Sequence, residues 1–337
     1  MQKKAIVTGG LGFIGSNLIK LLLKNNFFVI NIDKISYASN IYNLKNIKKK
    51  SNYKFYKSDI CNKKMFGMIL RKHRPNVLFN LAAETHVDRS INNPKNFIRS
   101  NIIGVFNILE CIKKYIKIKK KFRMIHVSTD EVYGDTKGLK KSKEGDKYQP
   151  SSPYSASKIA ADQLAISYYK SFDLPIKIAR PFNTYGPRQS ARAVIPSIII
   201  QLLKGKEVSL GDMNPTRDFN YVSDIVKGFV AALESDNCLG EVVNLGSNFE
   251  ISIKDTALTI AEVMNTSIKI KQDSQRFRPE KSEVERLFSS NEKAKKMLNW
   301  SPEYSGILGF KRGLEKTIDW FEKEENKTFY KNNIYNI

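Results

Sequence analysis

The sequence predicts an α/β protein in which a doubly wound parallel sheet is followed by a smaller C-terminal substrate domain. Two observations carry this prediction: short apolar runs alternate with helix-period segments from the N-terminus, and the pattern changes after residue 180. The chain has 337 residues, of which 41% are hydrophobic and 27% charged, so it is long enough for two domains and has a globular composition.

The predicted strands are short, rich in β-branched or aromatic residues, and bounded by polar residues or glycine, as expected for strands buried on both faces. They cover residues 5–8, 28–32, 53–56, 77–81, 124–128 and 176–179. The helices predicted between and after them cover residues 15–24, 63–73, 94–115 and 153–172. This alternation implies right-handed crossovers and therefore a parallel sheet.

Proline and glycine punctuate the chain after residue 180, and shorter elements follow. We expect a strand near 242–245 and helices near 253–264, 291–298 and 307–324. The predicted division is a sheet domain at residues 1–180, to which 219–250 returns, and a substrate-binding part at 181–325. Residues 326–337 form a polar, loosely held tail.

The chain carries 57 Lys and Arg against 33 Asp and Glu, a net charge of +24. Its lysines lie in stretches such as 47–50 and 117–121, mixed with Asn and Ile, and no arginine-rich tract is present. We interpret this charge as a solvated surface with no nucleic-acid partner, which leaves small anionic substrates compatible.

Three cysteines without CxxC spacing argue against a disulfide framework or a zinc site, and the three histidines show no metal-ligand spacing. No apolar run reaches membrane-span length, and the first apolar run is too short for a signal peptide. We therefore expect a cytoplasmic protein that holds no metal and contacts no membrane.

The first strand runs into TGGLGFIG at residues 8–15, a glycine turn that opens a helix. Glycines at such a turn allow the backbone N–H groups of the helix start to approach a pyrophosphate. The candidate residues are Gly9, Gly12, Phe13, Ile14 and Gly15.

Asp33 ends the second strand, 24 residues after Gly9, where an acid binds a ribose 2′-OH. It favours NAD by repelling a 2′-phosphate, although Lys34 leaves NADP open, and a plain surface carboxylate is the alternative. Asp59 and Ile60 follow the third strand as candidate adenine contacts.

The candidate reaction centre combines Thr129, at the end of the fifth strand, with Tyr154 and Lys158 on the helix at 153–172. Tyr and Lys four residues apart share one helical face, so the ammonium can lower the pKa of the phenol and make Tyr154 a base. The Tyr-x-x-x-Lys spacing alone usually reflects packing, but together with the glycine loop and Thr129 it becomes specific.

With these motifs the sequence resembles the extended short-chain dehydrogenase/reductases of the Rossmann type, and among them the nucleotide-sugar 4,6-dehydratases. The resemblance covers residues 4–322. It rests on TGGLGFIG (8–15), NLAAETHVD (80–88), TDEVYG (129–134), YSASK (154–158) and RDF (217–219).

The resemblance implies a sequence of C4 oxidation by NAD, loss of water across C5–C6 and return of the hydride to C6. In this reaction Asp130 would protonate the departing 6-hydroxyl and Glu131 would take the C5 proton, with Tyr154 as base at the 4-hydroxyl. Adjacent strand residues point to opposite faces, so both carboxyls can share a site only if the chain has left strand geometry. The alternative is that Asp130 merely caps a following helix.

Arginines suited to diphosphate contacts follow the sheet or lie in the C-terminal part: Arg180, Arg188, Arg192, Arg217 and Arg278. The resemblance points to Asn183, Arg217 and Arg278 as substrate ligands, although for any one arginine a surface salt bridge is equally compatible. The segments at 180–188, 214–220 and 278–284 depart from the dTDP-glucose type. They are most similar to the LegB-like group, which makes a 4-keto-6-deoxy nucleotide-GlcNAc for legionaminic-type sugars.

Several alternatives remain at this point. A dTDP-glucose 4,6-dehydratase and a UDP-glucuronate decarboxylase are the nearest enzymes, and Asp130 argues against the decarboxylase and against a 4-epimerase. A non-catalytic NAD- or RNA-binding module is the alternative from another class. The helices at 94–115 and 153–172 correspond to those that pair into homodimers in the family.

Overall fold

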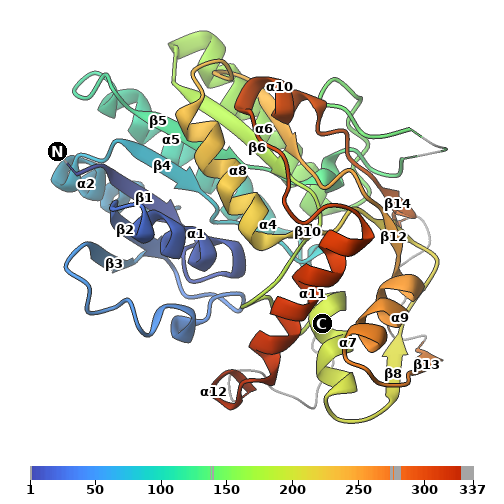
Figure 1. The fold of residues 1–337 in the computed structure, drawn as a ribbon. Coiled ribbons are helices and arrows are strands. Elements are labelled where there is room, and N and C mark those ends of the chain that lie inside the picture. The colour runs from blue at the N-terminus through green and yellow to red at the C-terminus, as the bar shows by residue number, and fades with distance from the viewer. Residues whose placement is uncertain (1, 137, 139, 274–275, 277–281, 328–337) are drawn as a thin grey trace.

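A seven-stranded parallel sheet forms the centre of the molecule (Figure 1). The computed structural model describes residues 2–136, 138, 140–273, 276 and 282–327. The strands lie side by side in the order β11 (Val242–Leu245), β6 (Ile176–Pro181), β5 (Arg123–Val127), β4 (Val77–Asn80), β1 (Lys4–Thr8), β2 (Phe28–Asp33) and β3 (Tyr53–Lys57). All neighbouring strands pair in parallel, which confirms the doubly wound α/β prediction.

Helices cover both faces of the sheet, because successive strand residues point to opposite sides. On β1, Ala5 and Val7 pack in one hydrophobic cluster with α1 (Phe13–Lys24) and α8 (Val222–Glu234). Ile6 packs in the opposite cluster with α2 (Lys63–His73), α5 (Gly104–Tyr115) and α6 (Pro153–Phe172). The carboxyl ends of the strands therefore meet at one edge between the two layers.

The single helix predicted at 94–115 is a composite in the structure. It comprises α4 (Lys95–Phe97), the π-helical turn η2 (Ile98–Ile103) and α5. A π-helical turn widens the backbone ladder within a continuous helical path, and such turns are common at functional sites.

Four of the helices that the structure describes were absent from the sequence prediction: α12 (Glu324–Lys327), α3 (Val87–Asn92), α7 (Val194–Leu202) and α8. The last two begin without a side-chain cap, and α8 follows the short strand β10 (Asn220–Tyr221) directly. The usual start signal was therefore missing, and the β-branched run within α7 has no clear helical period.

The C-terminal part has its own hydrophobic cluster, built from α7, α9 (Ile253–Val263) and α11 (Gly306–Glu322). Small sheets frame it: β10 with β7 (Thr184–Tyr185), β8 (Glu207–Leu210) with β13 (Lys269–Gln272), and β9 (Thr216–Arg217) between β12 (Ile251–Ser252) and β14 (Arg286–Leu287). Between these segments the chain returns to the main sheet through α8 and β11. The remaining elements are η1 (Ile41–Leu44), η3 (Asp130–Val132), α10 (Glu292–Leu298) and α12 (Glu324–Lys327).

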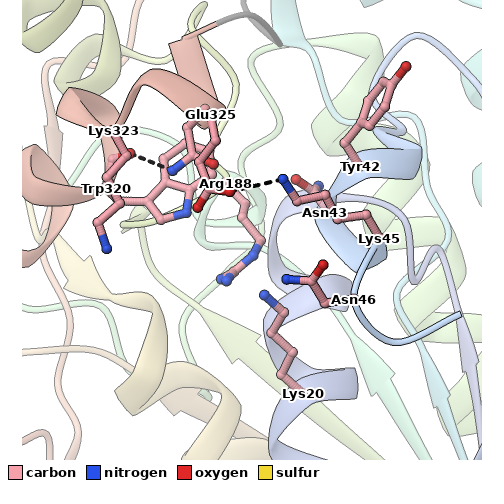
Figure 2. A pocket seen from close by; sticks show the side chains of 10 residues that line it. Lys20, Tyr42, Asn43, Lys45, Asn46, Arg188, Trp320, Lys323 and Glu325 are labelled. Carbon is pink, nitrogen blue, oxygen red and sulfur yellow. Dashed lines mark hydrogen bonds and ion pairs between the residues drawn. The ribbon is translucent and has the colours of Figure 1, made fainter. Parts of the chain in front are cut away.

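A cavity of about 200 Å³ lies where α1, the segment around η1 and the C-terminal end of α11 meet (Figure 2). Across the described ranges of the chain, no helix has the length and apolar character needed to cross a bilayer.

Candidate active site

The glycine loop packs closely against the segment that follows β4. Gly9 adopts a left-handed φ of +69°, and a Cβ there would lie 2.9 Å from the backbone nitrogen of Ala82. A Cβ on Gly15 would collide with the carbonyl oxygen of Gly9, so this glycine allows α1 to approach β1. Gly12 caps α1 without any side-chain hydrogen bond. Glycine at these positions thus leaves the helix N-terminus clear for an anionic group.

Asp33 is the last residue of β2, and its carboxylate accepts hydrogen bonds from the loops that follow β1 and β2. Its Oδ2 accepts a hydrogen bond from the Leu11 N–H at 2.9 Å, and its Oδ1 accepts from the Ile35 N–H and the Ser39 hydroxyl at 2.8 and 2.7 Å. Since only 5% of this residue is exposed, it is not the plain surface carboxylate of the alternative reading. Lys34 points to Glu84 instead, with its Nζ 2.7 Å from a carboxylate oxygen.

Asp59 and Ile60 follow β3 at the same edge of the sheet. Asp59 accepts a hydrogen bond from the Cys61 N–H at 2.9 Å, while Ile60 is buried and packs where a Cβ on Gly104 would be. The structure therefore places both residues next to the strand that carries Asp33, because Asp33 pairs in register with Lys57 on β3.

The acidic pair lies in the 3-10 turn η3, immediately after the fifth strand of the chain. Thr129 is extended, with φ −154°, and its hydroxyl caps the turn by accepting from the Glu131 N–H at 3.4 Å. The prediction that the chain leaves strand geometry before Asp130 is confirmed. Thr129, rather than Asp130, is the cap of this turn.

Asp130 is buried and held at both carboxylate oxygens. The Thr129 hydroxyl donates to Oδ1 at 3.1 Å, and the Asn183 side-chain amide donates to Oδ2 at 2.7 Å. Burial and the neighbouring charge of Glu131 raise the pKa of Asp130 to about 7, against the lowering effect of these two hydrogen bonds. The carboxyl can therefore hold a proton near neutral pH.

Tyr154 lies in the first turn of α6, which begins with a capping box between Ser152 and Ser155. Burial raises the pKa of Tyr154, a hydrogen bond with Thr129 partly offsets this rise, and the charges of Glu131 and Asp130 add to it. The pKa is thus raised, not lowered as expected from Lys158.

The physical reason lies in where the ammonium of Lys158 points. Its Nζ donates a 2.7 Å hydrogen bond to the carbonyl oxygen of Val127, at the end of β5. Burial lowers the pKa of Lys158 to about 8, while the charge of Asp162 raises it. The shared helical face brings Lys158 to the site, but in this structure its ammonium is hydrogen-bonded to the end of β5.

Asp162 was missed by the sequence analysis, although the spacing Tyr154, Lys158, Asp162 repeats every four residues along α6. It accepts from the Ser128 hydroxyl at 2.6 Å and from Arg180 at 2.7 Å. Burial raises the pKa of Asp162, but the nearby His126 ring, with Nε2 3.5 Å from Oδ1, and the charge of Arg180 lower it overall. Asp162 thus connects α6 to the ends of β5 and β6 through Ser128 and Arg180.

Arg180 is therefore a structural residue, which corrects its place among the arginines considered for the diphosphate. Its side chain has no exposed surface, and besides Asp162 it donates to the Tyr133 hydroxyl at 2.7 Å. A phosphate cannot replace these partners without exposing a buried ion pair.

Arg217 lies on β9 and faces the acidic pair closely enough that its charge lowers the pKa of Asp130. Its guanidinium donates to the carbonyl oxygen of Thr216 at 2.9 Å and pairs with Glu283 at 3.3 Å. Asn183 and Arg217 thus both act on Asp130, Asn183 through a hydrogen bond and Arg217 through its charge. Arg278, the third expected ligand, lies outside the described residues.

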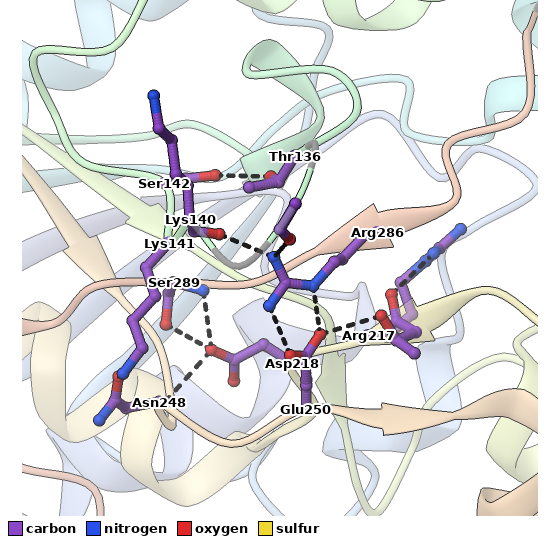
Figure 3. A network of polar contacts seen from close by, with 12 residues as sticks. Thr136, Lys140, Lys141, Ser142, Arg217, Asp218, Asn248, Glu250, Arg286 and Ser289 are labelled. Atoms are coloured by element: carbon purple, nitrogen blue, oxygen red, sulfur yellow. Dashed lines mark hydrogen bonds and ion pairs between the residues drawn. The ribbon is translucent and has the colours of Figure 1, made fainter.

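A polar network fixes the strand that carries Arg217 (Figure 3). The next residue, Asp218, is fully buried and accepts from the N–H groups of Ser247 and Ser289 at 2.9 and 3.2 Å. Arg286 on β14 pairs with Glu250 through two nitrogens, at 2.7 and 2.5 Å. These contacts connect the residues around β9 to the segments at 247–250 and 286–289.

Comparisons with known proteins identify the family of this chain. Residues 6–316 match the family model described as GDP-mannose 4,6 dehydratase. The dTDP-glucose 4,6-dehydratase of Haemophilus influenzae is 35% identical over 332 residues, covering 94% of this chain and 97% of that protein.

Solved structures give the same picture. The dTDP-glucose 4,6-dehydratase of Bacillus anthracis, crystallised with NAD, superposes with a TM-score of 0.85 at 32% identity, covering 98% of this chain and 99% of that one. The UDP-glucuronic acid 4-epimerase of Bacillus cereus, with UDP-glucuronic acid and NAD, gives 0.85 at 31% identity over 97% and 100%. The chain therefore belongs to the GDP-mannose 4,6-dehydratase family and is a nucleotide-sugar 4,6-dehydratase of the extended short-chain dehydrogenase/reductase type.

Proposed function

We propose that this protein dehydrates a nucleotide-diphospho-GlcNAc, with UDP or GDP as the nucleotide, to the 4-keto-6-deoxy sugar. The observation that carries the dehydration is the buried Asp130, which accepts hydrogen bonds from Thr129 and Asn183 and has a pKa raised to about 7. An elimination of water needs one group that gives a proton and another that accepts one. A 4-epimerase needs no such acid.

The residues of the loop after β1 fit NAD. Glycines at 9, 12 and 15 leave a cradle that a Cβ would fill, and Asp33 stands at the end of β2. The N–H groups of Phe13 and Ile14 would face the pyrophosphate, while the Gly12 N–H donates to the carbonyl oxygen of Gly9 at 3.1 Å and shapes the loop. Asp33 would lie at the ribose and Asp59 and Ile60 near the adenine. When bound, NAD supplies the acceptor and later the donor of the hydride.

The side chains of the site then move protons. Tyr154 takes the proton of the 4-hydroxyl as the phenolate, because a neutral phenol cannot hold a second proton. Burial raises the pKa of Tyr154, so the phenol must lose its own proton before this step. Glu131 takes the C5 proton once the neighbouring carbon is a ketone. Asp130 gives its proton to the departing 6-hydroxyl, so that water leaves.

The choice of GlcNAc rests on the segments at 180–188, 214–220 and 278–284, which depart from the dTDP-glucose type. Asn183, Arg217 and Arg278 are the proposed ligands of the nucleotide diphosphate. The names of the relatives favour dTDP-glucose as the second candidate substrate.

Substrate assays separate these candidates. Purified protein with NAD would be incubated with UDP-GlcNAc, GDP-GlcNAc and dTDP-glucose, and the products weighed by mass spectrometry. We expect loss of one water from a GlcNAc nucleotide, entry of solvent deuterium at C5, and a C6 hydrogen that originates from C4. Loss of water from dTDP-glucose alone would move the substrate to the second candidate, and solvent hydrogen at C6 would contradict internal hydride return.

We also propose that the protein forms a homodimer through the helices at 95–115 and 153–172. Large apolar side chains on these helices are exposed: Ile98, Ile103, Phe106 and Phe172. Light scattering should give twice the chain mass, and Ile103→Lys should give the monomer. A monomeric native protein would overturn this assignment.

A further inference from the structure

One face of α6 follows the end of β5 through a row of polar side chains. Tyr154, Lys158 and Asp162 are spaced four residues apart, so they lie one above the other along the helix. The Lys158 ammonium donates to the carbonyl oxygen of Val127 at 2.7 Å. The Asp162 carboxylate accepts from the hydroxyl of the next residue, Ser128, at 2.6 Å. These two contacts hold α6 in one register against the strand end, and the position of Tyr154 depends on that register.

A chain of buried hydrogen bonds crosses β1, β4 and β5 and leads to Asp162. The Thr8 hydroxyl accepts from the N–H groups of residues 81 and 82, so its own proton is donated to Oδ1 of Asn80 at 2.7 Å. The amide nitrogen of Asn80 therefore faces Nδ1 of His126, 3.1 Å away, and donates to it. Burial lowers the pKa of His126, so the ring is neutral and its proton is on Nε2, 3.5 Å from Oδ1 of Asp162. The orientation of this carboxylate is thus set from three strands.

Asp162 is also the anion that faces two buried cations, Lys158 and Arg180. Arg180 donates to the same carboxylate oxygen as Ser128, at 2.7 Å. Burial lowers the pKa of Lys158 to about 8 and the charge of Arg180 contributes to this, whereas the charge of Asp162 raises it. The remaining titratable neighbour, His126 on β5, is neutral. Without Asp162, two positive charges would share a space closed to water, and lysine loses its proton more readily than arginine.

We propose that Asp162 is a positioning residue for the C4 oxidation, which keeps Lys158 protonated and in register with the end of β5. Asp162 has no exposed surface, so it acts through Lys158 and does not touch the substrate. The inference rests on the proposed role of Tyr154 as the base at the 4-hydroxyl. Tyr154 must be a phenolate for that step, and a positive charge on the same face of α6 favours the phenolate.

Lysine Cε NMR of the full-length, NAD-loaded protein tests this assignment without any sugar substrate. The resonance that is missing from Lys158→Met belongs to Lys158, and its titration midpoint is the quantity measured. Asp162→Asn should lower this midpoint by about one pH unit, because the carboxylate charge is lost while that of Arg180 stays. Asp162→Glu keeps the charge and should restore the midpoint. Asp224→Asn, at another buried aspartate on α8, is the matched control and should leave the midpoint in place.

Single-turnover reduction of the nicotinamide measures the consequence for the C4 step, with whichever nucleotide sugar the protein dehydrates. Asp162→Asn should react at nearly the native rate at about pH 6 and roughly tenfold more slowly at about pH 9. The reason is that one pH unit in the midpoint changes the charged fraction of Lys158 about tenfold above that midpoint. Ser128→Ala removes one hydrogen bond to Asp162 but keeps its charge. Any loss in this variant should therefore be the same factor at both pH values.

The double variant Asp162→Asn with Arg180→Met covers the case in which Asp162→Asn alone fails to fold, because neutral side chains replace the whole buried ion pair. Asp162 affects Lys158 more than Arg180 does, so the midpoint should still fall, by less than in the single variant. An unchanged midpoint in a folded variant, or an equal loss of rate at both pH values in Asp162→Asn, would overturn the proposal. A lowered midpoint in a protein that reduces no nicotinamide with any nucleotide sugar would support the control of Lys158 by Asp162 and refute the proposed dehydration.

Discussion

The side-chain amide of Asn183 donates a 2.7 Å hydrogen bond to Oδ2 of Asp130, joining the chain after β6 to the turn after β5. The two residues lie on loops that leave adjacent parallel strands. This bond favours the ionised carboxylate, whereas burial and Glu131 favour the protonated acid. The acidity of Asp130 is therefore set jointly by two strand ends.

Removing this bond should raise the pKa of Asp130 further. We expect Asn183→Ala to move the alkaline limb of the elimination rate upward by about one pH unit, because a hydrogen bond to a charged group is worth about 1.5 kcal/mol. The pH profile of kcat measures this shift. Thr184→Val, at the neighbouring position, is the control and should leave the limb in place. A limb that stays fixed in Asn183→Ala would show that the bond does not set the acidity.

Asp130→Asn should slow elimination by about 10²–10⁴-fold while C4 oxidation continues. Rapid-mixing measurements of nicotinamide reduction and of product separate the two steps. Tyr154→Phe, by contrast, should suppress both. Equal and mild effects of the two variants would refute the assigned roles.

The pH dependence follows from the raised pKa of Asp130. Below about pH 7 the carboxyl is protonated and can serve as the acid, so elimination should decline as pH rises above 7. The same shift means that this group contributes stability at low pH, which is lost as pH rises from its ordinary value of 3.8 through about 7. Asp130→Asn should therefore raise the melting temperature at pH 8 relative to the native protein. An unchanged or lower melting temperature would contradict the raised pKa of Asp130.

Gly15→Ala should loosen the dinucleotide loop, because the added Cβ would collide with the carbonyl oxygen of Gly9. We expect a loss of about 1–3 kcal/mol in the free energy of unfolding and weaker retention of NAD. Chemical denaturation and the NAD content of purified protein measure these effects. Gly205→Ala, where no atom lies within 4 Å of the new Cβ, is the matched control. Similar behaviour of both variants would argue against close packing at Gly15.

Arg180→Leu should destabilise the fold by about 3–5 kcal/mol, because it leaves the Asp162 carboxylate buried without its cationic partner. Arg123→Leu removes a pair with the exposed Asp236 and should cost at most about 1 kcal/mol. Urea titration compares the two. An Arg180 variant of native stability with a raised KM would instead assign Arg180 to the substrate.

The sequence by itself determined the parallel sheet and the glycine loop, because both depend on local patterns. Buried strands read as apolar runs, and a Cβ at Gly15 would collide with Gly9 in the same loop, although Gly9 itself packs against Ala82 from a distant segment. The spacing of Tyr154 and Lys158 likewise fixed their common helical face.

Tertiary structure decided what those side chains meet. The Lys158 ammonium reaches the carbonyl oxygen of Val127, and Arg180 pairs with Asp162 inside the protein, because α6 packs over the ends of β5 and β6. The pKa of Asp130 depends on burial and on Asn183, which lies 53 residues away along the chain. Solvation and long-range contacts set these properties, and neither can be read from local spacing.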